Sequence, residues 1–118
     1  MEPRAIEKYQ QMNGSTVFPC GLVVAINHPH LAGSPDGIVK TTNAIILLEV
    51  KCPATIEKSG DFSKLPYLDE ELKLKTETDY MYQIQLNLFA CNLQTAHLFI
   101  FTPVKSHLIE VVRDNNLI

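Results

Sequence analysis

The segment AIILLEVKCP, at positions 44–53, constrains the fold more than any other part of the chain. Its four consecutive branched apolar residues, at positions 45–48, predict a β-strand that is buried on both faces. Glu49 and Lys51 continue this strand, and both point to one face because side chains alternate along a strand. A buried charge without a partner costs several kcal/mol. The two charges therefore need partners, unless they pair with each other or reach water at the end of the strand.

The remaining segments predict an α/β or α+β domain with a mixed central sheet. The chain has 118 residues, which is enough for one domain with one hydrophobic core. The polar residues 40–43 are expected to join two strands as a hairpin turn. Helices are expected at 1–14 and 76–94, and strands within 15–27 and at 38–39, 45–50, 96–103 and 107–114.

The segment 76–94 has the strongest helical pattern in the chain. Thr76, followed three residues later by Asp79, predicts a capping box at its start. Apolar residues recur at helical spacing along two sides of this segment, which predicts a central and buried helix. The polar stretch 54–75 before it shows no clear period, and this predicts a loop that is either functional or mobile.

Composition and charge narrow the class of protein. Apolar residues make up 46% and charged residues 19% of the chain, as in ordinary soluble globular proteins. No signal peptide or membrane-spanning run is apparent, and three scattered cysteines indicate reduced thiols, so we expect an intracellular protein that is not secreted. The net charge of −3 argues mildly against a general nucleic-acid binder, although a local patch or bound cations can outweigh this average.

Asp36 changes the interpretation of the charges on the strand. If the hairpin pairs through residues 40–43, Asp36 and Glu49 lie near the same end of it. Two carboxylates repel each other unless a cation lies between them, and a hard divalent ion with oxygen ligands would remove that cost. Lys51 could then orient or help to deprotonate a water molecule. In isolation, however, Pro-Asp-Gly is also an ordinary turn sequence.

The order of three motifs resembles a known family. Asp36 followed by Glu49-Val50-Lys51 is the arrangement of the PD-(D/E)xK nucleases. The segments LAGSPDGIV, LEVKCP and DYMYQIQLNLFACN, in this order, resemble the YqaJ-type viral recombinase (lambda exonuclease) family, and the resemblance runs from about residue 2 to the closing VVRD. It implies a restriction-endonuclease-like core, with a mixed central β-sheet flanked by helices.

The resemblance also implies the metal ligands. Asp36 and Glu49 correspond to the residues that bind the catalytic Mg²⁺, which Mn²⁺ could replace, and the backbone carbonyl of Val50 to a further ligand. Lys51 corresponds to the lysine that activates or positions the attacking water. Glu2, in the segment EPRAIEKY, corresponds to an upstream glutamate that could hold a second metal ion.

One helical residue completes the implied site. Gln83 belongs to a Y-x-x-Q-x-Q pattern and is expected to face the active site together with Tyr80 and Asn87. The alternative is that Gln83 caps a neighbouring strand or loop. Gln85 points elsewhere and is expected to be structural.

The function implied is that of a Mg²⁺-dependent deoxyribonuclease, an exonuclease on double-stranded DNA ends in recombination or repair. An endonuclease and a truncated, non-catalytic DNA-binding or assembly module remain alternatives. The helical region that precedes the upstream glutamate in the family is not found, so residues 1–118 are expected to be a single nuclease core, and recognition of the 5′ end is in doubt. Relatives of the lambda type form rings of three around DNA, which makes a homo-oligomer an open expectation.

Overall fold

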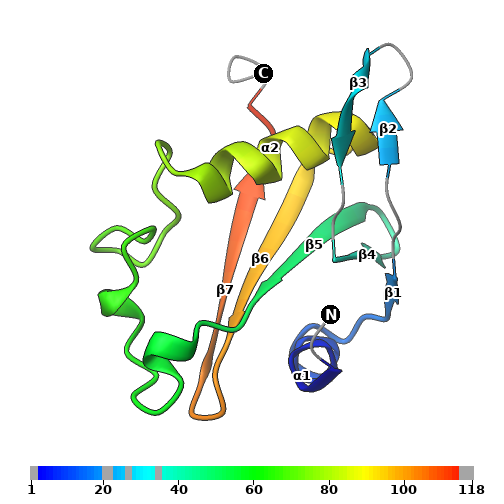
Figure 1. Ribbon diagram of the computed structural model, residues 1–118. Helices are drawn as coiled ribbons and strands as arrows, with labels where there is room; N and C mark the ends of the chain where they lie inside the picture. The colour runs from blue at the N-terminus through cyan, green and yellow to red at the C-terminus, as the bar shows by residue number, and fades with distance from the viewer. Residues whose placement is uncertain (1–2, 20–22, 26–27, 34–35, 115–118) are drawn as a thin grey trace.

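A computed structural model describes residues 3–19, 23–25, 28–33 and 36–114 of the chain. These residues form two α-helices, two short 3₁₀ helices and seven strands (Figure 1). The helices are α1 (Pro3–Asn13), η1 (Ala54–Ile56), η2 (Phe62–Lys64) and α2 (Asp79–Cys91). The strands are β1 (Val17–Pro19), β2 (Val23–Ala25), β3 (His28–Gly33), β4 (Gly37–Lys40), β5 (Ile45–Lys51), β6 (Thr95–Phe101) and β7 (Ser106–Val112).

Five of the strands form a mixed sheet in the order β1-β4-β5-β6-β7. Only β5 and β6 are parallel to each other, and the other neighbours in this sheet are antiparallel. Parallel neighbours need a long crossover, and the segment that contains α2 supplies it. The strands β2 and β3 form a separate antiparallel pair beside α2 (Figure 1). The predicted α+β fold with a mixed sheet is confirmed.

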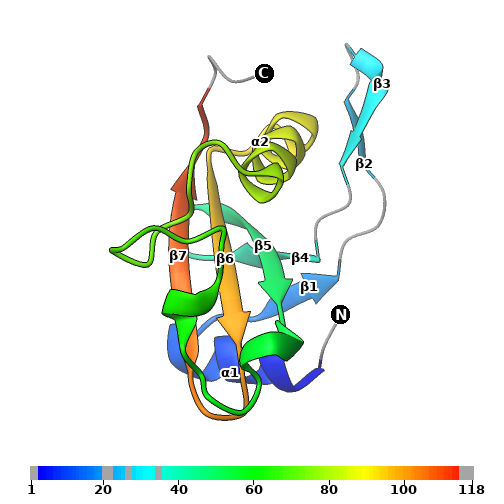
Figure 2. The same ribbon diagram turned by 60° about the vertical axis from the view of Figure 1, so that its left-hand side comes forward.

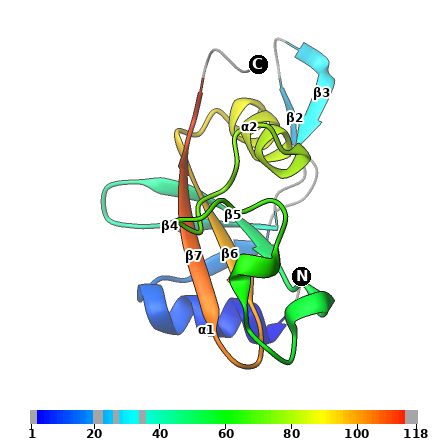
Figure 3. The ribbon, with the colours of Figure 1, turned by 90° about the vertical axis from the view of Figure 1, so that its left-hand side faces the viewer.

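The two α-helices lie on opposite faces of the five-stranded sheet (Figures 2 and 3). Because side chains alternate along β5, Leu47 packs on the α2 side and Leu48 on the α1 side, and both are fully buried. The same alternation places Glu49 and Lys51 on the α2 side. No helix among the described residues is long and apolar enough to cross a membrane.

The central strand and helix are less buried than the sequence predicts. Ile45 is 47% exposed, so the part of β5 that is buried on both faces begins only at Leu47. On α2, Tyr80 is 37% and Tyr82 52% exposed, because the sheet covers one side of the helix and leaves part of the rest to solvent. The prediction that α2 is a central, buried helix is therefore wrong for the side that carries these tyrosines.

The helix α2 also begins later than predicted. Its N-cap is Thr78, whose side-chain oxygen accepts a hydrogen bond from the Met81 amide at 3.2 Å. The predicted cap Thr76 lies outside the helix, which starts at Asp79. Thr78 has extended backbone angles, as an N-cap residue requires.

The segment 54–75, for which the sequence predicts a functional or mobile loop, packs against the sheet. It contributes buried apolar side chains to the core on the α2 side, namely Ile56, Phe62, Leu65, Leu68 and Leu74. A β-bridge between Leu68 and Leu74 closes its second half. The buried residues are unevenly spaced because the segment bends through two 3₁₀ helices and this bridge, which explains why its sequence shows no period.

Candidate active site

Asp36 lies beside β5 because the β4–β5 hairpin pairs as the sequence predicts. Gly37 is opposite Leu48 in the register of this hairpin. The amide of Asp36 donates to the Leu48 carbonyl at 3.1 Å, and its Oδ2 accepts from the Val50 amide at 2.7 Å. These two hydrogen bonds hold the Asp36 carboxylate against the strand that carries Glu49.

Glu49 is a buried carboxylate, only 6% exposed. Burial and the neighbouring Asp36 carboxylate raise its pKa from 4.5 to about 7, while Lys51 and the hydrogen bond from Asn87 act in the opposite direction. The Asn87 Nδ2 donates this hydrogen bond to Glu49 Oε1 at 2.7 Å. The structure therefore brings Asp36, Glu49 and Lys51 close enough for their charges to interact.

Gln83 reaches the acidic pair through Asn87. Gln83 Nε2 donates to Asn87 Oδ1 at 3.2 Å, and Asn87 in turn donates to Glu49. Gln83 itself lies on the exposed side of the helix, whereas Asn87 is only 1% exposed. The sequence predicts that Asn87, four residues after Gln83, continues the same face of α2, but not that Asn87 is the side chain that donates to Glu49.

Gln85 points away from the acids, as expected. Its Nε2 donates to the Val112 carbonyl at 3.0 Å, and its Oε1 accepts from the Asp114 amide at 2.8 Å. It thereby ties α2 to the end of β7.

Lys51 lies at the end of β5 and contacts an aromatic ring. Its Nζ is 4.5 Å from the ring centroid of Tyr80 on α2. Tyr67, from the segment 54–75, makes a T-shaped contact with the same ring, with centroids 4.6 Å apart. Tyr67 could not be predicted from the sequence, because nothing in an aperiodic segment indicates which of its side chains meets the helix.

The donor set suits a hard divalent cation. Asp36 and Glu49 present carboxylate oxygen atoms, which Mg²⁺ and Mn²⁺ prefer to nitrogen or sulfur, and the charge of Asp36 contributes to the raised pKa of Glu49. Among the described residues, no group of three or more His, Cys, Asp or Glu side chains is placed to hold a metal. Glu2, the further carboxylate expected from the sequence, lies outside the described residues.

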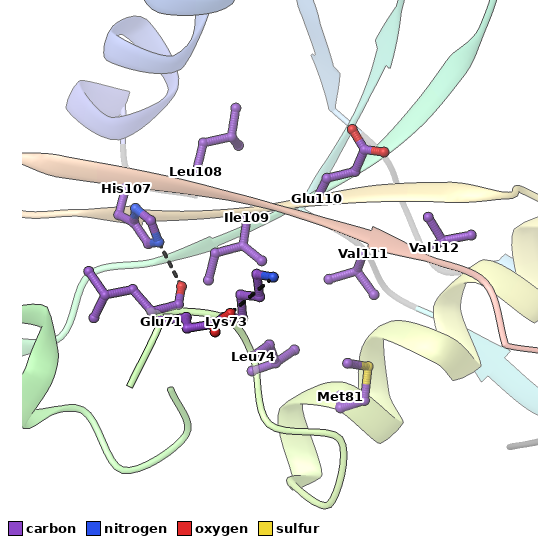
Figure 4. Close-up of a pocket in the computed structure, with 11 residues that line it drawn as sticks. Glu71, Lys73, Leu74, Met81, His107, Leu108, Ile109, Glu110, Val111 and Val112 are labelled. Carbon is purple, nitrogen blue, oxygen red and sulfur yellow. Dashed lines mark hydrogen bonds and ion pairs between the residues drawn. The ribbon is translucent and has the colours of Figure 1, made fainter. Parts of the chain in front are cut away.

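A separate hollow of about 520 Å³ lies between β7 and residues 71–74 (Figure 4). His107 closes part of it by donating from Nε2 to the Leu72 carbonyl at 2.8 Å. Its remaining lining is largely apolar, while Leu108 and Glu110 point to the opposite side of β7 in Figure 4. Because this hollow contains neither the acidic pair nor Lys51, we do not assign the chemistry to it.

Comparisons with known proteins agree with the motifs and the fold. Two crystal structures of LHK-Exo, an alkaline exonuclease from Laribacter hongkongensis, are similar to this chain. One of them is in complex with dAMP. Each matches 98% of this chain with a TM-score of 0.73 and 23% sequence identity. The match covers 55% and 56% of the LHK-Exo chains, so this chain spans little more than half of their length. None of the curated proteins compared with the chain matches it significantly. The family model of the YqaJ-like viral recombinase domain matches residues 1–94, and the chain therefore belongs to this family.

Proposed function

We propose that residues 1–118 form the core of a Mg²⁺-dependent deoxyribonuclease that hydrolyses phosphodiester bonds at the ends of duplex DNA. The observation that carries this proposal is the buried Glu49 carboxylate beside Asp36, with Lys51 on the same face of β5. Membership of the YqaJ-like family supports DNA as the substrate, in recombination or repair inside the cell. The likeness to an alkaline exonuclease supports an exonuclease over other nucleases.

The carboxylates of Asp36 and Glu49 and the carbonyl of Val50 would hold the Mg²⁺, and Mn²⁺ could replace it. A divalent ion held by these groups would supply positive charge to the phosphate and would lower the pKa of a bound water. Glu2 is proposed to add a further carboxylate from the N-terminal segment.

The side chains around the acidic pair prepare it for this chemistry. Asn87 holds one oxygen of Glu49 in place, and Gln83 holds Asn87, so the carboxylate keeps one orientation before the substrate binds. Lys51 provides a positive charge beside the acids, where negative charge develops as the phosphodiester bond breaks. A fixed charge at this place lowers the barrier more than one that has to reorient during the reaction.

The test compares linear with closed circular duplex DNA, with and without Mg²⁺. We expect Mg²⁺-dependent loss of linear DNA only, abolished in Lys51→Ala and unchanged in Lys58→Ala, which removes an exposed lysine of the segment 54–75. DNA binding should weaken as salt rises, because counterions are released from the phosphates.

Two outcomes would contradict the exonuclease proposal. Cutting of closed circles would assign an endonuclease. Binding of DNA without turnover in any divalent metal would assign a non-catalytic binding module.

A further inference from the structure

The ammonium group of Lys51 lies over the face of an aromatic ring. Its Nζ lies 4.5 Å from the centroid of Tyr80, within the range in which a cation is attracted to the face of an aromatic ring. Tyr80 occupies the first turn of α2, two residues after the Thr78 cap, and is 37% exposed. The Tyr80 ring thus extends from a capped helical turn, next to the Lys51 end of β5.

A second ring supports the first. Tyr67 meets Tyr80 in a T-shaped contact, with centroids 4.6 Å apart and an angle of 78° between the planes. Such pairs are favourable beyond their buried area. Burial and the neighbouring Tyr80 raise the pKa of Tyr67 to about 12, so its ring stays uncharged. Tyr67 belongs to the segment 54–75, whose buried leucines anchor it on the sheet.

We propose that Tyr80 is a positioning residue for Lys51 and that Tyr67 holds Tyr80 in place. The lysine side chain has four rotatable bonds, and a free one would have to be ordered when the substrate binds. A ring attracts the ammonium without using any of its three N–H donors, which remain available to the acids, to water or to a phosphate. The inference rests on the proposed function only for what Lys51 then does.

The first test measures the contact itself and does not depend on turnover. Reductive ¹³C-methylation keeps the positive charge of lysine and gives each lysine an NMR signal, and Lys51→Arg assigns the signal of Lys51. We expect this signal to be shifted upfield by the Tyr80 ring, to keep that shift in Tyr80→Phe and to lose it in Tyr80→Leu. Tyr82→Leu is the matched control, since Tyr82 is an exposed tyrosine of the same helix.

A variant of the supporting ring separates positioning from folding. Tyr67→Leu leaves Tyr80 and its helix cap intact, so the Lys51 signal should move part of the way toward its position in Tyr80→Leu while the other lysine signals stay unchanged. An unshifted Lys51 signal in the unsubstituted protein, or one that ignores Tyr80→Leu, would overturn the proposal. A signal that ignores Tyr67→Leu would overturn the role of Tyr67.

The second test uses the cleavage of linear duplex DNA. Tyr80→Leu should lower kcat about tenfold with little change in KM, as expected for the loss of one cation–ring contact that orients a group in the transition state. Tyr80→Phe should retain kcat, and Tyr82→Leu should match the unsubstituted protein. A loss in Tyr80→Phe equal to that in Tyr80→Leu would overturn the positioning role. If the unsubstituted protein shows no turnover, the proposed function fails, and the NMR shift alone decides whether the ring holds Lys51.

Discussion

Removing the charge of Glu49 should stabilise the metal-free protein at neutral and alkaline pH. Burial and Asp36 raise the pKa of Glu49 from 4.5 to about 7, so the folded protein binds this proton more tightly than the unfolded chain does. The stability that this proton contributes is complete below pH 4.5 and is lost as the pH rises through about 7. In Glu49→Gln the side chain is neutral at every pH, and its oxygen still accepts from Asn87.

The magnitude follows from the size of the shift. A change from 4.5 to about 7 corresponds to about 3 kcal/mol at 1.36 kcal/mol per pKa unit. Because solvent screens part of the interaction with Asp36, we expect about 2 kcal/mol in the free energy of unfolding. For a chain of 118 residues this is a rise in Tm of roughly 8 °C.

The assay is thermal unfolding in EDTA at about pH 5 and about pH 8, followed by the addition of Mg²⁺. Glu49→Gln should exceed the unsubstituted protein in Tm near pH 8, exceed it by much less near pH 5, and gain no stability from Mg²⁺. Glu70→Gln, which removes an exposed carboxylate, should leave both the pH dependence and the Mg²⁺ effect unchanged. If Glu49→Gln is no more stable than the unsubstituted protein near pH 8, Glu49 is not the strained, buried anion that we infer.

Three further predictions concern the parts that support the site. Thr78→Ala removes the side-chain cap of α2 and should lower the free energy of unfolding by about 1 kcal/mol in denaturant titrations, with Thr76→Ala as the uncapped control. Leu68→Ala empties a buried position of the segment 54–75 and should cost about 2–5 kcal/mol, whereas a mobile loop would show almost no loss. Burial lowers the pKa of His97 below 6.5, and Glu110 opposes this shift. The free energy of unfolding should therefore fall as the pH drops below 6.5. His97→Gln should remove this fall, measured in the Glu49→Gln background, where the titration of Glu49 is absent.

The acidic pair could be predicted because it depends on local geometry. A hairpin with a short polar turn fixes its own register, so the separation of Asp36 and Glu49 along the chain also determines their proximity in space. The alternation of side chains then places Lys51 on the same face as Glu49. These two rules need no knowledge of the rest of the fold.

The contacts of α2 could not be predicted in the same way. The pattern of apolar residues indicates that α2 is a helix. Its exposed tyrosines count as apolar in this pattern, so the sequence predicts a second buried face that the helix does not have. Which helical side chain meets Glu49 depends on how far the helix is rotated and shifted over the sheet, and long-range packing decides that. For the same reason, the pairing of Tyr67 with Tyr80 became visible only in the structure.

Asn87 offers a test of this packing from the side of the helix. Glu49 contacts Asn87, and Lys51, two residues further along β5, contacts Tyr80. Tyr80 lies two turns before Asn87 on α2. The helix therefore runs in the opposite direction to the strand. Asn87→Asp replaces the hydrogen-bond donor at Glu49 by a third acid. Without metal, near pH 8, it should lower the free energy of unfolding by about 2 kcal/mol.

The exchange of both partners separates stability from metal binding. In the double variant Glu49→Gln with Asn87→Asp, the amide on β5 donates to the carboxylate on α2, so the hydrogen bond returns with its donor and acceptor reversed. Most of the stability lost in Asn87→Asp should therefore be regained in urea titrations. Stabilisation by Mg²⁺ should not return, because the carboxylate now extends from the helix and no longer from the strand beside Asp36. Equal stabilisation by Mg²⁺ in the exchanged pair and in the unsubstituted protein would show that an acid at position 49 is not required, and Glu49 would lose its assignment as a ligand.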